Sequence, residues 1–388
     1  MIERRNNMIG TPRYVVHLCQ FRKNCTEVMT EFNAAWGGTN VEYGYSVKTN
    51  RDPELILYAN RNLGWKIEVV SPDEYNYVKG MGINDEDIIL NGPCKIQLFQ
   101  QFSDLPSIVN LDNYNEVNEF VRCFPGYKGL VGLRVNFDLE SRCPGETTAG
   151  EEVSRFGIDA DSSEFMECMN LLAKAQIVNI GLHLHTSTKT RSLNVFTEIA
   201  HKAIELKKET NYAFRFIDIG GGFFGGQIVQ GKPTMKQYAT AICDVLKTEY
   251  NPISTKLILE PGASVLATCV SYETRIVNKR SIRGVSIFTV DGSLLHINPF
   301  MTKRTQPFEI LEANLAERPK INKQIVGGAT CMENDRLANL VDYTELREGD
   351  LLSFKFAGAY TMGFNSHFIL NPPHIDYDHD NYSREITR

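Results

Sequence analysis

The sequence lacks the features that are typical of nucleic-acid-binding, membrane-spanning and exported proteins. Its 47 acidic residues outnumber its 41 lysines and arginines, and the net charge of −6 provides no basic surplus for binding a phosphate backbone. No apolar run reaches the length of about 18 residues that a membrane-spanning helix needs. The segment 1–16 is charged and contains no apolar core of a signal peptide. We therefore expect no nucleic-acid partner, no membrane span and no export.

Cysteine pairs at metal-binding or redox spacing are also missing. The nine cysteines include no C-x-x-C spacing, and an odd number cannot all pair within one chain. This pattern is typical of reduced thiols and predicts a cytoplasmic protein. Repeats, low-complexity tracts and long linkers are absent as well, so domain boundaries have to come from a change in the hydrophobic pattern.

The hydrophobic pattern changes once, near residue 265. Before this point, short β-rich runs alternate with segments of helical periodicity. Strands are expected at 41–47, 65–70, 87–90, 107–112, 130–136, 177–185, 214–219 and 256–260, and helices at 53–63, 72–80, 95–102, 115–123, 162–175, 192–210 and 234–249. Eight strands that alternate with helices predict a (β/α)8 TIM barrel, because parallel strands need helical crossovers. An open, doubly wound sheet is the alternative.

The remainder of the chain is rich in β-strand signals. YETRIV, VSIFTV, QIVGGAT and LLSFKFAGAY follow one another, separated by Gly, Pro and Asn. The sequence therefore predicts an α/β protein with a barrel at 24–265 and a β-rich domain, sandwich-like or barrel-like, from 1–23 and 266–388. The strand-like segment RYVVHL at 13–18 is expected to join the sheet of the second domain.

Polar residues follow several predicted barrel strands directly, at the end where barrel enzymes carry their active sites. Lys48 is a candidate for imine formation, because a low-dielectric mouth disfavours its ammonium form; a structural ion pair is the alternative. The glycines 220–222 can cradle a phosphate with backbone N–H groups, or simply make a tight turn. Glu260 can bond a heterocyclic nitrogen, or be structural.

A metal site is not expected. His183 and His185 are two residues apart on a predicted strand, so their rings point to opposite faces, and no carboxylate or cysteine nearby in the sequence completes a set of ligands. An amine, a glycine-rich phosphate cradle, a carboxylate for a ring nitrogen and an imidazole to stack are instead what pyridoxal 5′-phosphate requires.

These residues belong to motifs that extend over most of the chain. The motifs are Tyr45–Asn50, Glu68–Ser71, Leu133–Asn136, Ser154–Gly157, Gly181–His185, Asp218–Phe223, Glu260–Gly262, Gly327–Cys331 and Ala357–Tyr360. In order and spacing they resemble the fold-type III pyridoxal-phosphate amino-acid decarboxylases, which include ornithine, diaminopimelate, biosynthetic arginine and carboxynorspermidine decarboxylases.

The resemblance implies a role for each matching residue. Lys48 would form the aldimine with the cofactor, His185 would stack on its ring, and Cys331 would reprotonate the carbanion of the quinonoid intermediate after decarboxylation. The implied cofactor-binding residues are Lys48, Glu68, Arg134, His185, Thr188, Gly220, Gly221, Gly222, Glu260 and Tyr360. The resemblance also implies a homodimer with shared active sites, in which the cysteine of one subunit reaches the barrel of the other.

Several departures from the family pattern affect the substrate. Ala263 replaces a common arginine, Asn298 replaces an arginine that grips a distal carboxylate, and Met332 replaces an acid that binds a distal amine. The segments 186–188 and 366–374 also differ from the usual motifs, and the second resembles members from siderophore and other specialised pathways. We expect a small amino-acid-type substrate, free or conjugated. A racemase or epimerase on the same barrel and a non-catalytic regulatory homologue are the alternatives.

Overall fold

The computed structural model of the chain describes residues 10–38, 40–102, 105–303, 305–311, 315–364 and 367–378. The described residues form two compact units, one within Lys23–Val265 and the other within Met1–Arg22 and Leu266–Arg388. Residues 1–9, on which the expectation of no export signal largely rests, lie outside the described part, as does Ser366 in the unusual segment 366–374. No helix of the described part is long and apolar enough to cross a membrane.

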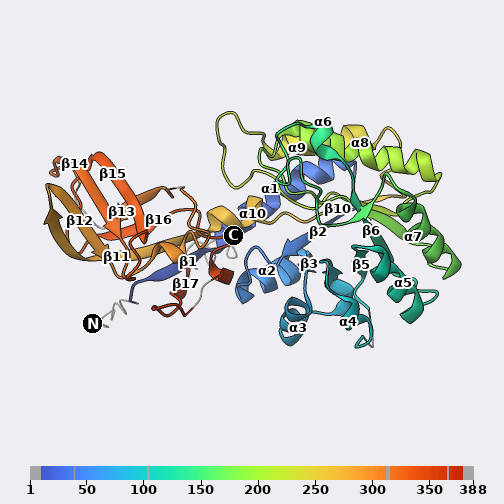
Figure 1. Cartoon of the computed structure of the whole chain (residues 1–388), viewed down its shortest axis with the longest axis horizontal. Helices are drawn as coiled ribbons and strands as arrows, with labels where there is room; N and C mark the ends of the chain where they lie inside the picture. The colour runs from blue at the N-terminus through green and yellow to red at the C-terminus, as the bar shows by residue number, and fades with distance from the viewer. Residues whose placement is uncertain are drawn as a thin grey trace, which may run out of the picture. The chain divides into compact units, whose positions relative to one another are not determined.

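Unit Lys23–Val265 contains a closed barrel of eight parallel strands (Figure 1). The strands are β2 (Val41–Ser46), β3 (Lys66–Val69), β4 (Ile88–Leu90), β5 (Ile108–Leu111), β6 (Leu130–Asn136), β8 (Ile180–His183), β9 (Phe216–Asp218) and β10 (Lys256–Leu259). Each pairs with the next in this order, and the pairing of β10 with β2 closes the ring. The short β7 (Ile158–Asp159) adds to β6 outside the ring. The predicted barrel is confirmed.

Helices connect the strands. They are α1 (Leu18–Trp36), α2 (Pro53–Leu63), α3 (Pro72–Gly80), α4 (Ile96–Phe99), α5 (Tyr114–Cys123), α6 (Leu139–Arg142), α7 (Ser163–Lys174), α8 (Leu193–Thr210), α9 (Met235–Leu246) and α10 (Ala263–Leu266), with the 3-10 turn η1 (Asp85–Asp87) before β4. Side chains of Asp52, Ser71, Asn113, Ser192 and Thr234 accept hydrogen bonds from the first helical N–H groups. These caps fix where each crossover helix starts after its loop.

The inside of the barrel is filled with apolar side chains. Ile89, Ile108, Phe216 and Ile258 form a fully buried cluster on strands β4, β5, β9 and β10. Gly181 makes room for it, because a Cβ there would lie 2.3 Å from Phe216 Cδ1. This packed interior prevents water from passing through the ring, so chemistry is confined to its carboxyl-end mouth.

The second unit is built from antiparallel and mixed sheet. Its strands are β1 (Arg13–His17), β11 (Val270–Ile282), β12 (Val285–Val290), β13 (Phe308–Leu311), β14 (Lys320–Gly327), β15 (Arg336–Thr344), β16 (Leu351–Phe354) and β17 (His374–Asp378), with 3-10 turns η2 (Ala267–Cys269), η3 (Leu294–His296) and η4 (Met362–Phe364). Strand β1 pairs antiparallel with β11 and parallel with β17. The segment 13–18 therefore joins this sheet, as expected.

Candidate functional site

Polar side chains gather at the mouth of the barrel because neighbouring strands end there. Strand β2 lies between β3 and β10, so Lys48, two residues beyond β2, falls between Glu68 on β3 and Glu260, which follows β10. Strand β9 lies on the other side of β10 and ends in Asp218, and β8 beside it ends in His183. The barrel order thus brings together residues that are up to 212 positions apart, as Lys48 and Glu260 are.

The amine of Lys48 is held by one carboxylate. Lys48 Nζ lies 2.6 Å from Glu68 Oε1 and 2.7 Å from Oε2, and Ser46 Oγ donates to Oε2 at 2.5 Å. Glu68 is fully buried, whereas 32% of the Lys48 side chain is exposed. Lys48 is therefore ion-paired while part of its side chain remains exposed.

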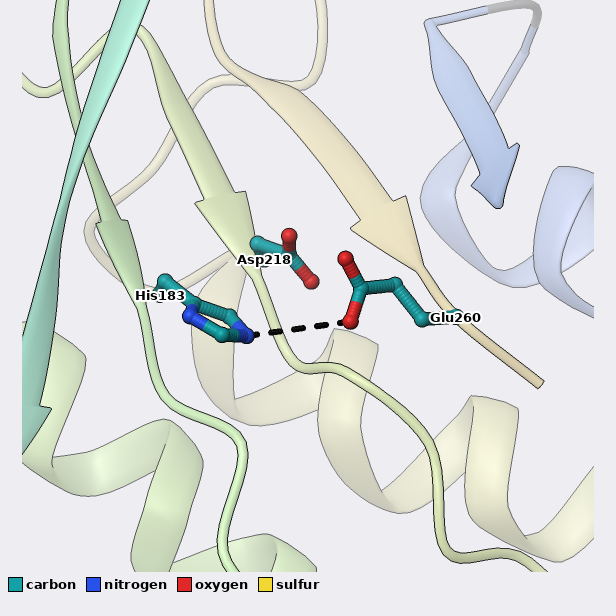
Figure 2. A group of neighbouring side chains, drawn as sticks. All are labelled: His183, Asp218 and Glu260. Atoms are coloured by element: carbon teal, nitrogen blue, oxygen red, sulfur yellow. Dashed lines mark ion pairs between the residues drawn. The ribbon is translucent and has the colours of Figure 1, made fainter. Parts of the chain in front are cut away.

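Beside this pair lies a cluster of three buried side chains, His183, Asp218 and Glu260 (Figure 2). His183 Nε2 is 3.7 Å from Glu260 Oε2, and the Asp218 and Glu260 carboxyl groups face one another. Burial, and then the charge of Glu260, raise the pKa of Asp218 well above its ordinary value. Burial and the Arg134 cation hold the pKa of His183 well below its ordinary range. The surroundings therefore favour the protonated form of Asp218 and the neutral form of the His183 ring.

The cluster also corrects one sequence-based argument. No carboxylate near His183 in the sequence could complete a set of ligands, yet strands β9 and β10 bring Asp218 and Glu260 to it, with potential ligand atoms within 4.8 Å of one another. Their oxygens, however, already accept hydrogen bonds: Glu260 Oε1 from Asn91, and the two Asp218 oxygens from Gly220 N and Asn110. These carboxylate oxygens of the cluster are therefore engaged by side-chain and backbone amide donors.

Asn91 and Asn110 are site residues that the sequence-based reasoning missed. Both amides are almost fully buried, Asn91 directly after β4 and Asn110 within β5. Asn91 Nδ2 donates to Glu68 Oε1 at 3.0 Å and to Glu260 Oε1 at 2.7 Å. The available signal was a single amide inside or directly after an otherwise apolar strand, since such a group needs a buried partner.

The glycines 220–222 form a loop that only glycine can build. Gly220 has a φ of +70°, and a Cβ there would lie 2.5 Å from His185 Cβ. A Cβ on Gly221 would lie 2.3 Å from the carbonyl oxygen of Glu260. The Gly221 N–H donates to His185 Nδ1 at 3.3 Å, so the backbone and the imidazole are in direct contact. Loss of hydration and the nearby Lys48 cation hold the pKa of His185 well below its ordinary value, so this ring is also neutral.

Two buried hydroxyl groups beside this loop have no partner. They are Thr49 Oγ1 and Ser264 Oγ. A Cβ on Gly262 would lie 2.5 Å from Thr49 Oγ1, and one on Gly225 would lie 2.9 Å from Ser264 Cβ, so both side chains border glycines of the mouth. A buried unpaired hydroxyl costs free energy unless an acceptor reaches it.

The residues present therefore fit pyridoxal 5′-phosphate, which the sequence resemblance implies. The unpaired hydroxyls and the glycine loop offer donors for a phosphate, Glu260 offers an acceptor for a ring nitrogen, and Lys48 offers an amine for the aldehyde.

Arg134 and Thr188, two further predicted residues, are on this unit. Arg134 Nη1 pairs with Asp112 Oδ1 at 3.3 Å, and its Nη2 donates to the His185 carbonyl at 3.5 Å. Burial lowers the pKa of Arg134. Its guanidinium contacts the backbone of His185 and stacks over the Phe156 ring. Thr188 forms a backbone bridge with Thr147 in the loops beyond the strands, so its contact to a phosphate stays a prediction.

Cys331 and Tyr360 belong to the other unit. Cys331 is exposed in the loop between β14 and β15. Asp335 holds this loop by accepting from Thr330 Oγ1 at 2.6 Å, and a Cβ on Gly328 would lie 2.2 Å from its carboxylate. Tyr360 is 39% exposed with a φ of +55°. Both side chains are accessible on the surface of the β-rich unit.

Comparisons with known proteins give a family and a fold. The family described as "Pyridoxal-dependent decarboxylase, pyridoxal binding domain" matches residues 19–267. Diaminopimelate decarboxylase of Aquifex aeolicus (strain VF5) is 26% identical over 360 residues, which cover 89% of this chain and 82% of the relative. Ornithine decarboxylase 2 of Drosophila melanogaster is 25% identical over 346 residues, covering 84% and 83%. A crystal structure of diaminopimelate decarboxylase from M. jannaschii with L-lysine has the same fold, with a TM-score of 0.82 at 21% identity over 95% of this chain and 87% of that one.

Proposed function

Because the chain belongs to the family of pyridoxal-dependent decarboxylases, we propose that it removes the α-carboxylate of an amino acid or an amino-acid conjugate at the mouth of its barrel. The observation that carries this proposal is the convergence of Lys48, the 220–222 glycine loop and Glu260 at one end of eight parallel strands. Pyridoxal 5′-phosphate is the cofactor of the family, and the site has matching groups for its aldehyde, phosphate and ring nitrogen.

In this proposal the barrel residues hold the cofactor. Lys48 would hold the cofactor through its aldehyde group, and Glu68 would keep the lysine nitrogen at the mouth through its two short contacts. The glycine loop, with Ser264 and Thr49, provides donors for the phosphate. Ser264 supplies a donor next to Ala263, where relatives carry an arginine. When bound, the cofactor supplies a pyridinium ring that accepts the electron pair left on the α-carbon as carbon dioxide departs.

His185 and Cys331 have separate tasks in this reaction. The neutral His185 ring is anchored by the Gly221 N–H and offers an uncharged face on which an aromatic cofactor ring can stack. Cys331 Sγ carries the proton that replaces carbon dioxide: the C–C bond to the carboxylate breaks, and the new C–H bond takes the thiol proton. The thiolate then regains a proton from solvent, which reaches this exposed loop.

We further propose that the active unit is a homodimer. Cys331 and Tyr360 lie on a different compact unit from Lys48, and both are exposed. The family resemblance supports a shared site in which these two residues meet the barrel mouth of a second copy.

The substrate proposal rests on the residues at the positions where relatives bind the distal group of their substrate. Asn298 Nδ2 donates to Thr302 O at 2.7 Å and its Oδ1 accepts from Thr302 N at 3.1 Å, so this amide caps its own turn. Glu333 forms an ion pair with Arg336. Asn298 and Met332 carry no charge for a distal carboxylate or amine, and the exposed Glu333 pairs with its neighbour Arg336. A charged distal group buried without a partner loses hydration that nothing replaces. We therefore propose a modified or conjugated amino acid.

Carbon dioxide release tests the proposed function. The cofactor-loaded protein is incubated with diaminopimelate, ornithine, lysine and larger amide-linked analogues, and carbon dioxide and the amine product are quantified for each. We expect equal amounts of both from an amide-linked analogue, with kcat/KM on the order of 10²-fold above that of the free diamino acids. Exchange of the α-hydrogen without carbon dioxide would indicate the racemase instead. Cofactor binding without turnover of any substrate would indicate a non-catalytic homologue.

A further inference from the structure

The two carboxylates of the site are connected through one buried amide. Asn91, 3% exposed, directs its Nδ2 group at both: one hydrogen bond reaches Glu68 Oε1 (3.0 Å) and the other Glu260 Oε1 (2.7 Å). Carboxylate oxygens only accept, so the Asn91 nitrogen must face them and its oxygen must face away. Both hydrogens of one amide nitrogen are thereby used to span the mouth from β3 to β10.

A second amide completes the connection. Asn110 Nδ2 donates to Asn91 Oδ1 at 2.8 Å and to Asp218 Oδ2 at 3.2 Å. The Asn110 Oδ1 atom has no hydrogen-bond partner and lies against Gly132, where a Cβ would be 1.8 Å away. The Asn110 amide is therefore oriented with its nitrogen toward Asn91 and Asp218, and this orientation leaves its buried oxygen without a hydrogen bond. That arrangement costs free energy, which a purely packed interior would avoid.

The two carboxyl groups accept hydrogen bonds from different amides: Glu260 from Asn91, and Asp218 from Asn110. The carboxyl groups of Asp218 and Glu260 face one another, and burial together with the charge of Glu260 raises the pKa of Asp218. Among charged groups, the Arg134 cation on β6 acts electrostatically on Glu260 and also on Glu68 of β3. Asn91 donates to Glu260 and gives nothing to Asp218, so it stabilises the ionised form of Glu260 in particular.

We propose that Asn91 is a positioning residue: it holds Glu260 as the ionised acceptor for a ring nitrogen. This inference rests on the proposed function, because the ring nitrogen belongs to pyridoxal 5′-phosphate. It adds a residue that acts through the Glu260 carboxylate.

A cofactor analogue separates this role from a structural one. In 1-deazapyridoxal 5′-phosphate a carbon replaces the ring nitrogen, so the analogue has every contact except the one with Glu260. Full-length protein is stripped of cofactor, and dissociation constants for both compounds are measured by the change in their absorbance. We expect Asn91→Ala to weaken pyridoxal phosphate binding by about ten- to hundredfold, as for loss of a hydrogen bond to a charged group, and to change binding of the analogue by less than about twofold.

Three further variants keep the test decisive. Asn91→Ser, a smaller change, should show the same selective loss even if Asn91→Ala folds poorly. In a Glu260→Ala background, Asn91→Ala should have no further effect on the preference for pyridoxal phosphate. Asn40→Ala is the matched control: its Nδ2 also makes two hydrogen bonds, at 2.9 Å to Pro252 O and Thr255 O, ahead of the amino end of β2. This control should bind both compounds as the unmodified protein does.

The binding results separate a failure of the Asn91 inference from a failure of the proposed function. If Asn91→Ala weakens both compounds equally, the residue is structural and the inference is wrong while the proposed function stands. If Asn91→Ala and Asn91→Ser leave the preference unchanged, Asn91 does not act through Glu260. If the unmodified protein binds neither compound, the proposed function itself is wrong.

Discussion

Single side chains at the barrel mouth differ in whether their polar atoms already have partners. Glu68 and Asn91 are fully engaged, whereas the hydroxyls of Thr49 and Ser264 are buried and unpaired. A group whose partner is missing in the protein alone is one that a ligand can satisfy. The unpaired hydroxyls therefore indicate the phosphate end of the cofactor more directly than the paired ones do.

Ser264→Ala should change stability and cofactor affinity in different directions. Removing an unpaired buried hydroxyl should leave the free energy of unfolding of the cofactor-free protein unchanged or up to about 1 kcal/mol higher. Loss of a hydrogen bond to a charged phosphate should weaken cofactor binding by about tenfold. Chemical denaturation and absorbance titration measure the two quantities. A destabilised protein with unchanged cofactor affinity would show that the hydroxyl has a structural partner instead.

The sequence predicted the site residues that follow strands directly. It did not predict the residues that only hydrogen-bond to other site residues. Lys48, Glu260 and the glycine loop were predicted because each follows an apolar run directly, and the structure places them at one mouth. Asn91 and Asn110 were not, because an isolated asparagine carries no spacing signal. Their role depends on the closure of the ring. Closure brings Asn91 after β4 into hydrogen-bond contact with Glu260 after β10, and Asn110 on β5 into contact with Asp218 on β9.

Elements of the barrel were more predictable than those of the β-rich unit. All eight barrel strands and the helices α2, α3 and α8 lie where the hydrophobic pattern indicated them. Strands β13, β15 and β17 were missed. The short β17 is rich in polar residues and has no buried residue, and β15 mixes buried Leu337 and Ala338 with exposed charges. These strands are defined by pairing with distant partners, which local sequence does not encode.

The turn η3 carries a pH-sensitive contribution to the stability of its unit. His296 is 4% exposed, and its Nδ1 hydrogen-bonds to the Tyr272 hydroxyl at 2.8 Å. Burial lowers the pKa of His296 to about 4. Because the unfolded chain then binds the proton more tightly than the folded one, stability falls as the pH drops from about 6.5 toward 4.

Between pH 7 and pH 5 this residue alone should cost about 2 kcal/mol of unfolding free energy. Denaturant titrations of the unmodified protein and of His296→Gln measure it. The buried His183 and His185 of the barrel also make the folded protein less stable in acid, but they do so equally in both proteins. The difference in unfolding free energy between the two proteins therefore reports on His296. Parallel pH dependences for both proteins would contradict the assignment.

At the scale of the whole molecule, the proposed reaction needs residues from two compact units. Lys48 and Cys331 lie on different units, and a shared dimeric site predicts complementation between subunits. Lys48→Ala and Cys331→Ala proteins should each be inactive alone. After subunit exchange, mixed dimers should regain activity, because one of their two sites then contains an intact lysine and an intact cysteine. Demonstrated exchange without recovered activity would place both residues of a site on the same subunit.

Borohydride reduction followed by peptide mapping tests the central claim most directly, because it fixes the attachment of the cofactor to one atom. The purified protein is loaded with pyridoxal 5′-phosphate, reduced, digested and analysed by mass spectrometry. We predict one modified peptide, with the reduced cofactor on Lys48 Nζ, and no modification of the Lys48→Ala variant under the same conditions. Attachment to another lysine, or no attachment after complete loading, would contradict the account.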